Sequence, residues 1–288
     1  MLLRSICRPR LLLGEWAGWC CSFDGRSGMV QPVPDQFVTE EMREWEHIPN
    51  GFEEFATEAW LSGDGLGRRR TVRILPEVGC NIENLPALVS HEVLPEAPVC
   101  KEGAWASDTL VRGSMWRCET VFHGLGGVRP RARRDALPGL AERTRVTVFF
   151  DAAQGALHDG ELIVIRQERL WSEQPTLELN EASGSRSGLD GAWVSSAVGL
   201  ACFGDMPSPV ACDAAVDGLQ RQTLPGGVTV VAAGDGSLDV LLQDPQGHEL
   251  HLRRRWAVAA PASLPEVQTF SSGVRSSPSL PDADPVSS

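Results

Sequence analysis

The sequence predicts an all-β protein whose main domain is a single antiparallel β-barrel of about ten strands with one or two short helices. Short segments in which apolar and polar residues alternate are separated by turns rich in glycine, proline and aspartate. Helical segments are too few to supply the crossovers that parallel strands need. The first and last strands carry side chains that suit each other, which favours a barrel over a β-sandwich.

Closure of the barrel is predicted from Arg254, near the end of this domain. Alternate side chains of an extended strand share a face, so Arg254 lies in a row of apolar side chains within residues 249–258. A cation in such a row needs an electron-rich or anionic neighbour. We expect the indole of Trp16, on the first strand, to provide it through a cation–π contact of about 0.5–2 kcal/mol. Trp16 and Arg254 are therefore predicted to close the barrel.

The elements follow from the period of the apolar residues along the chain. Residues 35–47 predict an amphipathic helix with Asp35 as N-cap, either a lid over the barrel mouth or a plug in its core. The strands at 145–150 and 161–171 should pair antiparallel because their connection is short. A second short helix is expected at 208–219. Strands are also expected at 11–22, 52–61, 69–75, 88–93, 105–111, 114–122, 176–180, 193–203, 227–233, 237–243 and 249–258.

These elements divide the chain into three parts. Residues 1–10 are basic and apolar and are predicted to be an N-terminal extension, either a targeting remnant or a linker. Residues 11–260 form the barrel domain. Residues 261–288 are rich in serine and proline, a composition typical of a disordered tail.

Composition excludes several classes of function. A net charge of −12 disfavours nucleic acid as a partner, because the phosphate backbone attracts clustered cations. Eight cysteines without a Cys-x-x-Cys pair support neither a zinc knuckle nor a redox motif, and a reducing compartment is expected. No apolar run approaches the roughly 20 residues of a membrane span.

The sequence shows no catalytic or metal-binding motif. His248 and His251 are an odd number of residues apart on a strand, so their rings point to opposite faces and do not share an ion. The sequence also lacks the Gly-x-Ser-x-Gly elbow of the α/β-hydrolases. We therefore expect no catalytic residue and no metal.

Two charged pairs are the best candidates for a binding site. Arg117-x-Glu119 and Arg166-x-Glu168 each place a cation and a carboxylate on one strand face beside apolar residues. Facing inward, the arginines would bind carboxylates of a ligand and the glutamates would accept hydrogen bonds from its N–H groups. Facing outward, they would be cross-strand ion pairs of little energetic value. Trp116 and Trp171 complete the predicted ligand-binding set.

Two motifs resemble known families. Gly14-x-Trp16 on the first strand, with an arginine on the last, resembles the lipocalin and wider calycin pattern of small ligand-binding barrels. The runs Gln167-Glu168-Arg169-Leu170-Trp171 and Pro175-Thr176-Leu177-Glu178-Leu179 are similar to two segments of the phycobiliprotein chromophore lyases of the S/U type, Glu-Glu-Arg-Ile-Trp and Pro-Asn-Leu-Arg-x-Arg.

The second resemblance implies a lipocalin-like barrel that handles open-chain tetrapyrroles, with a light-harvesting protein as partner, in cyanobacteria or plastids. Glu168 and Arg169 match that family's pattern, whereas Glu178 and Asn180 stand where it has two arginines. Loss of this basic pair removes partners for bilin propionates. The resemblance therefore implies a related lipocalin-like protein of plastid or cytoplasmic location rather than an active lyase.

We accordingly expect non-catalytic binding or chaperoning of a small hydrophobic or tetrapyrrole-like ligand, such as a bilin, inside the barrel. Two alternatives stay open. One is a bilin lyase that transfers its ligand to an acceptor cysteine. The other is a barrel with a filled interior that acts as an assembly factor for another protein.

Overall fold

The computed structural model describes residues 13–38, 40–44, 52–61, 67–74, 87–94, 99–101, 104–123, 142–157, 162–172, 219–243 and 248–272. Most residues in these ranges are in β-strands, and every strand pair in them is antiparallel, which confirms the predicted all-β class. The helical elements described are short: η2 (Asp35–Phe37), α1 (Glu40–Glu44) and η4 (Pro225–Gly227).

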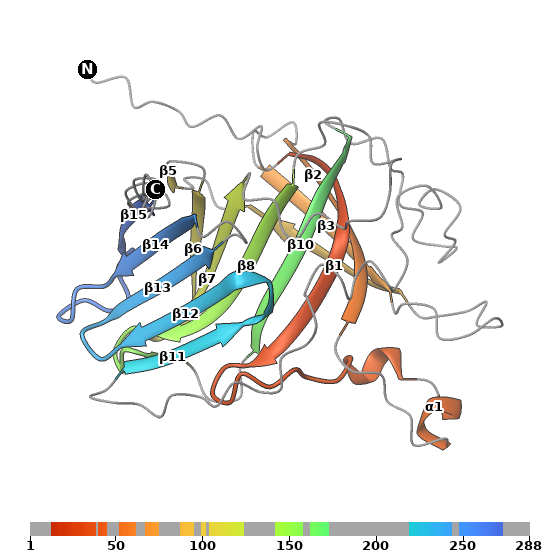
Figure 1. Cartoon of the computed structure of the whole chain (residues 1–288), viewed down its shortest axis with the longest axis horizontal. Coiled ribbons are helices and arrows are strands. Elements are labelled where there is room, and N and C mark those ends of the chain that lie inside the picture. Colours follow the sequence, from red (N-terminus) through yellow and green to blue (C-terminus); the bar gives the residue numbers. More distant parts are fainter. Residues whose placement is uncertain are drawn as a thin grey trace, which may run out of the picture.

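The strands form two separate sheets rather than one (Figure 1). The larger sheet has ten strands, nine of them in one path and β9 (Ala156–Leu157) paired with β8. Its path runs β4 (Ala87–Val93), β3 (Gly67–Ile74), β2 (Phe52–Leu61), β1 (Gly14–Asp24), β10 (Leu162–Ser172), β8 (Glu142–Asp151), β7 (Met115–His123), β6 (Ala104–Arg112) and β5 (Val99–Lys101).

The smaller sheet is a five-stranded meander. It consists of β11 (Leu219–Leu224), β12 (Val228–Ala233), β13 (Ser237–Gln243), β14 (Glu249–Arg255) and β15 (Glu266–Ser272), in that order. Side chains alternate along each of these strands, so that one face of the meander is apolar: Val228, Val230 and Ala232 of β12 are completely buried. This apolar face has to be covered by another layer.

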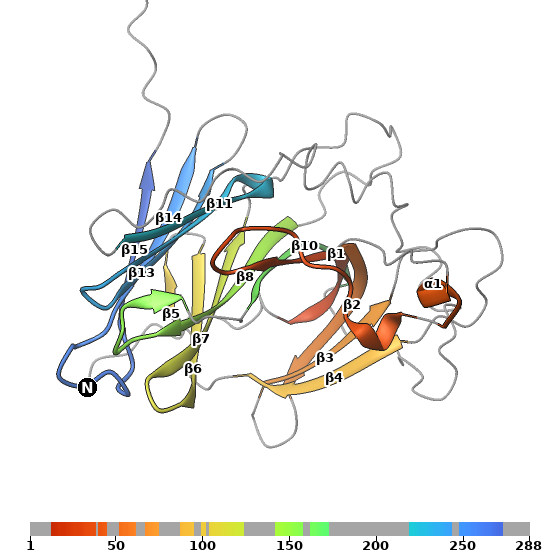
Figure 2. The same ribbon diagram turned by 90° about the horizontal axis from the view of Figure 1, so that it is seen from below.

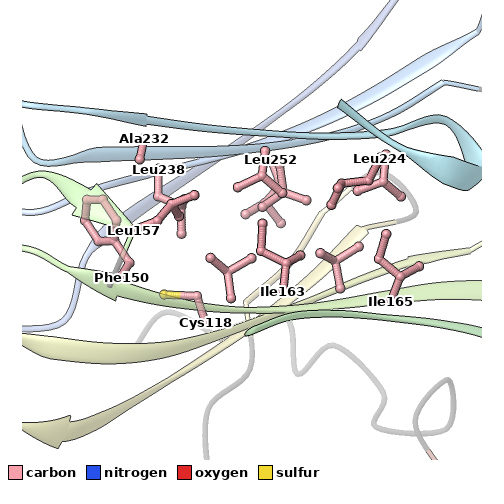
Figure 3. Packing of buried hydrophobic residues seen from close by; sticks show 14 of the residues in the cluster. Cys118, Phe150, Leu157, Ile163, Ile165, Leu224, Ala232, Leu238 and Leu252 are labelled. Atoms are coloured by element: carbon pink, nitrogen blue, oxygen red, sulfur yellow. The ribbon is translucent and has the colours of Figure 1, made fainter. Parts of the chain in front are cut away.

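The ten-stranded sheet covers it, and the apolar core lies between the two sheets (Figure 3). Ile163 and Ile165 of β10 and Phe150 of β8 point toward Leu238 and Leu252 of the meander. Burial of this many aliphatic and aromatic side chains, at about 25 cal/mol per Å² of apolar surface, is the main stabilising contribution in the fold.

The ten-stranded sheet curls strongly away from the meander (Figure 2). Strands β3 and β7 are separated by β2, β1, β10 and β8 in the sheet, yet Arg69 of β3 reaches Glu119 of β7 at 2.8 Å. The path nevertheless ends in two edges, since no pairing between β4 and β5 is found in the described residues.

The predicted contact between Trp16 and Arg254 is wrong. Strand β1 pairs with β2 and β10, whereas β14 pairs with β13 and β15 of the other sheet. The completely buried Arg254 guanidinium lies between the sheets and donates to Asp108 Oδ1 at 2.6 Å, Thr120 Oγ1 at 2.8 Å and the Glu119 carbonyl at 2.8 Å. The expected need of this cation for an anionic neighbour is met, but by Asp108.

Several other predicted elements differ from those in the structure. The predicted tail from residue 261 is wrong for β15, in which Val267 and Thr269 pair with Arg254 and Leu252 of β14. The described part of the helix expected at 35–47 consists of η2 and α1, and Phe37 is completely buried. Strands β5, β9 and β11 were not predicted. The predicted segments 1–10, 176–180, 193–203 and most of 208–219 lie outside the described residues.

Arg254 provides a test of how the sheets are joined. In Arg254→Met, Asp108 would keep a buried charge without its partner, so we expect the free energy of unfolding to fall by about 3–5 kcal/mol. Arg253→Met is the matched control, because its side chain is 45% exposed and binds Asp239 on the outer face. Its cost should stay below about 1 kcal/mol. Urea denaturation measures both, and equal losses would contradict this role of Arg254.

Candidate functional site

The candidate site is the inward face of the ten-stranded sheet, defined as the face turned away from the meander. Strand register places the side chains: Glu168 of β10 lies opposite Arg143 of β8, and Arg166 lies opposite Arg145. Alternate residues of the same strands, such as Ile165 and Val146, point the other way into the core between the sheets. These strands are therefore buried on both faces, one apolar and one charged.

Glu119 lies at the centre of the charged face and is held by two arginines. Arg69 donates from Nη1 and Nη2 to the two carboxylate oxygens, both at 2.8 Å, in a bidentate pair. Arg145 donates from Nη1 to Oε1 at 2.6 Å. Only 7% of the Glu119 side chain is exposed to solvent.

Glu168 continues this arrangement toward β1. Arg145 donates from Nε to Glu168 Oε1 at 2.7 Å, and Arg143 donates from Nε to Oε2. The Arg143 guanidinium also lies over the Trp16 ring, 3.5 Å from its centroid. Trp16 thus makes the cation–π contact that the sequence predicted, but with Arg143, because Trp16 belongs to the inward face and Arg254 does not.

The opposite end of the arrangement is more open. Arg69 also donates to Glu92 of β4, and Arg117 donates to Glu92 Oε1 at 3.1 Å. Glu92 and Arg117 are 29% and 32% exposed. Burial alone would raise the pKa of Glu92, but Arg69 and Arg117 outweigh burial and lower the pKa to about 2. We call the continuous series of contacts the ion-pair network: Arg143, Glu168, Arg145, Glu119, Arg69, Glu92 and Arg117.

Among the side chains that the structure describes in the network and beside it, cations outnumber carboxylates. The network contains four arginines and three glutamates. Arg166 adds a fifth cation, whose guanidinium lies over the ring of Phe55 at 5.3 Å and whose charge contributes to the lowered pKa of Glu92. Its Nε atom is buried and finds no hydrogen-bond partner within the described ranges. An anion would be stabilised here.

Two further nitrogen atoms on this face have no partner among the described residues. They are Nε1 of Trp105, a residue 4% exposed, and Nε2 of His123. Trp105 lies opposite Val121 of β7 and packs against it. Burial lowers the pKa of His123, the positive charge of Arg143 lowers it further, and the result is a pKa of about 4. His123 is therefore neutral at physiological pH.

The structure brings together four of the predicted ligand-binding residues: Arg117, Glu119, Arg166 and Glu168 all belong to the inward face. The outward alternative is wrong for Glu119 and Glu168, which are 5% and 3% exposed. In the structure, the oxygens of both glutamates accept hydrogen bonds from arginines of the chain, and their acceptance from a ligand stays a prediction.

The two tryptophans of the predicted set are placed differently. Trp116 lies between the sheets, where its Nε1 donates to the Pro261 carbonyl at 2.8 Å and its ring contacts Trp256. Its membership of the ligand set is therefore wrong, because neighbouring residues of a strand point to opposite faces. Trp171 lies on β10, and its side chain is outside what the structure describes.

Arg69, Arg143, Arg145 and Glu92 belong to the site but were not predicted. Arg143-x-Arg145 is a signal that the sequence does contain, since two cations two residues apart share a face of a strand. Arg69 and Glu92 carried no such signal. Their role depends on the curl of the sheet, which brings β3 and β4 to β7.

Comparisons with known proteins leave the family open. No protein-family model matches the sequence, and no curated protein matches it. One similar solved structure is a protein of unknown function from the DUF3598 family of Nostoc punctiforme, with 10% identity and a TM-score of 0.45 over 90% of this chain and 94% of that one. A likeness at this level identifies neither a family nor a function.

Two searches of the described ranges concern metals and membranes. No group of three or more histidine, cysteine, aspartate or glutamate side chains in them is arranged to hold a metal ion. No helix in the same ranges is long and apolar enough to cross a lipid bilayer.

The ion-pair network predicts a graded effect of arginine substitutions on stability. Arg145→Met would remove one partner from both Glu119 and Glu168 in a buried setting, so we expect a loss of about 3–5 kcal/mol. Arg117→Met, at the open end, should cost less than about 1 kcal/mol. Urea denaturation measures the difference. A loss for Arg117→Met as large as that for Arg145→Met would show that burial along the network is not graded.

His123 predicts a pH dependence of stability. Its pKa of about 4 in the folded protein lies below the ordinary value of 6.5, so the unfolded chain binds the proton more readily. Its contribution is therefore complete above about pH 6.5 and declines as the pH falls toward 4. Between pH 7.5 and 5.0 the loss should be about 2 kcal/mol.

Comparing His123→Asn with the unsubstituted protein in urea at these two pH values isolates this contribution, because most carboxylates titrate below pH 5. The variant should lose less stability across the interval. An identical loss in both proteins would assign the effect to other groups.

Proposed function

We propose that the curled sheet is a calycin-type barrel that binds, without catalysis, a hydrophobic or tetrapyrrole-like ligand bearing carboxylate groups. The excess of arginine over glutamate among the described side chains of the inward face, in which Arg117 and Arg166 are partly buried, carries this proposal. A buried charge without a counter-ion is costly, and a ligand carboxylate would supply the missing charge.

The arrangement around Arg166 and Arg117 suits such a ligand. Both cations lower the pKa of Glu92, whose Oε2 accepts from Arg69 and whose Oε1 accepts from Arg117. Arg117 also lies 3.8 Å from Glu119 Oε2, whereas Arg166 makes no ion pair with a carboxylate of the described residues. Phe55, beneath Arg166, adds an aromatic face. A few fixed polar groups within apolar surroundings are typical of small-molecule sites, where apolar contacts supply affinity and polar groups set orientation.

A second function has its own supporting observation. Each carboxylate of the network accepts from at least two arginines of the same chain, so part of the inward face is occupied by its own side chains. A filled interior of this kind suits a protein that acts through its outer surface as an assembly factor. Lack of binding to every tested small molecule would favour this function.

The test is binding by the full chain. Native mass spectrometry and absorbance titration would follow incubation with biliverdin, haem, a chlorophyll precursor and a fatty acid. We expect a one-to-one complex with at least one carboxylate ligand. The bilin lyase alternative would require transfer of a bilin to a cysteine of a light-harvesting protein. A plastid location is proposed together with a tetrapyrrole ligand.

Arg166 predicts the effect of a substitution on this binding. Arg166→Gln removes the charge that would contact the ligand carboxylate, so the affinity for the ligand found above should fall about 10- to 100-fold. Arg255→Gln is the matched control, because that side chain is 64% exposed and belongs to β14 of the meander, not to the sheet that carries the site. Titration of both variants should show a loss for Arg166→Gln alone. Equal affinities would remove Arg166 from the site.

A further inference from the structure

The unpartnered polar atoms of the inward face have one chemical property in common. Those of Trp105, His123 and Arg166 are all nitrogens. The indole Nε1 and the guanidinium Nε are always donors, whereas the carboxylate oxygens of Glu119 and Glu168 already accept from arginines. Trp105 and Arg166 therefore offer a ligand two buried donors that no acceptor of the described residues occupies.

Two of these donors lie in one row across the sheet. Trp105 of β6 is opposite Val121 of β7, Val121 is opposite Arg145 of β8, and Arg145 is opposite Arg166 of β10. Neighbouring strands are about 4.8 Å apart, so the ends of this row are about 14 Å apart along the sheet and closer across its curl. A compact anion does not reach both ends.

The two residues in the middle of the row, Val121 and Arg145, determine which chemical groups suit the central part of the ligand. Val121 is completely buried and forms an apolar contact with Trp105. The guanidinium of Arg145 already donates to Glu119 and Glu168, so its charge is paired within the chain. A ligand lying along the row meets an apolar contact and a neutralised guanidinium between two donors.

We infer that the site is specific for an elongated ligand with acceptors at both ends, a carboxylate at Arg166 and a carboxylate or carbonyl at Trp105. This inference rests on the proposed function and adds a chemical class to it. Ligands with an amine at either end are excluded, because an ammonium group would face a donor. Bringing a donor to a donor leaves both buried groups unpaired, which costs far more than a missing contact.

Three chain acids of equal length test the inference by isothermal titration calorimetry with the full chain: dodecanedioic acid, dodecanoic acid and ω-aminododecanoic acid. The extended dicarboxylate is about as long as the row. We expect it to bind at least about 10-fold more tightly than the monocarboxylate, and the amino acid to bind most weakly.

Two tryptophan variants locate the second acceptor. Trp105→Phe keeps an aromatic ring but removes the donor, so the advantage of the dicarboxylate should disappear while affinity for dodecanoic acid stays the same. Trp256→Phe is the matched control: its Nε1 is also buried and unpartnered in the described structure, but it lies in the core between the sheets. That variant should keep the preference.

The outcomes separate the two proposals. Failure of every ligand in this and the preceding panel would overturn the proposed function. Equal binding of the mono- and dicarboxylate, tight binding of the amino acid, or binding of a panel ligand but none of the three acids would overturn the inference alone. Should Trp105→Phe fail to fold, the ranking of the three acids by the unsubstituted protein decides.

Discussion

The bidentate contact between Arg69 and Glu119 links the two arms of the curled larger sheet. Both of its hydrogen bonds are 2.8 Å long, and it joins β3 to β7 across an interval of four intervening strands. Hydrogen bonds between neighbouring strands set the local twist but not how far the two arms of a sheet approach each other. A planar guanidinium on a planar carboxylate fixes both distance and orientation. This contact is one of those that enclose the inward face.

The stability of the fold has a different origin. Burying ions costs several kcal/mol for each group, and replacing a buried ion pair by apolar side chains is often neutral or stabilising. The network therefore does not explain why the chain folds; the apolar layer between the sheets does. What the network provides is an arrangement of fixed charges, with Arg143 supported by Trp16 and Arg69 shared between two carboxylates. Such an arrangement is suited to orienting a ligand.

Local patterns in the sequence predicted most strands, because alternation of residues is a property of neighbours. The meander β12 to β14 and the antiparallel pair β8 and β10 follow directly from it. Partition into two sheets was not predictable in this way, since it depends on contacts such as Arg254 with Asp108, 146 residues apart. In β8, the alternation of Arg143 and Arg145 would suit a face exposed to solvent, but both are 1% exposed because another part of the same sheet covers them. The face of a strand can be predicted locally, whereas what covers that face cannot.

The two sheets are linked at the residue on which the site is centred. The Glu119 side chain accepts from Arg69 and Arg145 on the inward face, and its carbonyl accepts from Arg254, which comes from the meander on the other side of the sheet. Arg254 is held in turn by Asp108 and Thr120, so its position is determined by three contacts. The β7 backbone at Glu119 is thereby held by Arg254 on the face toward the meander, while the Glu119 side chain binds the arginines of the inward face. A displacement of the meander would move Glu119, and with it the arginines that we assign to the ligand. The meander is therefore the support of the site as well as one wall of the core.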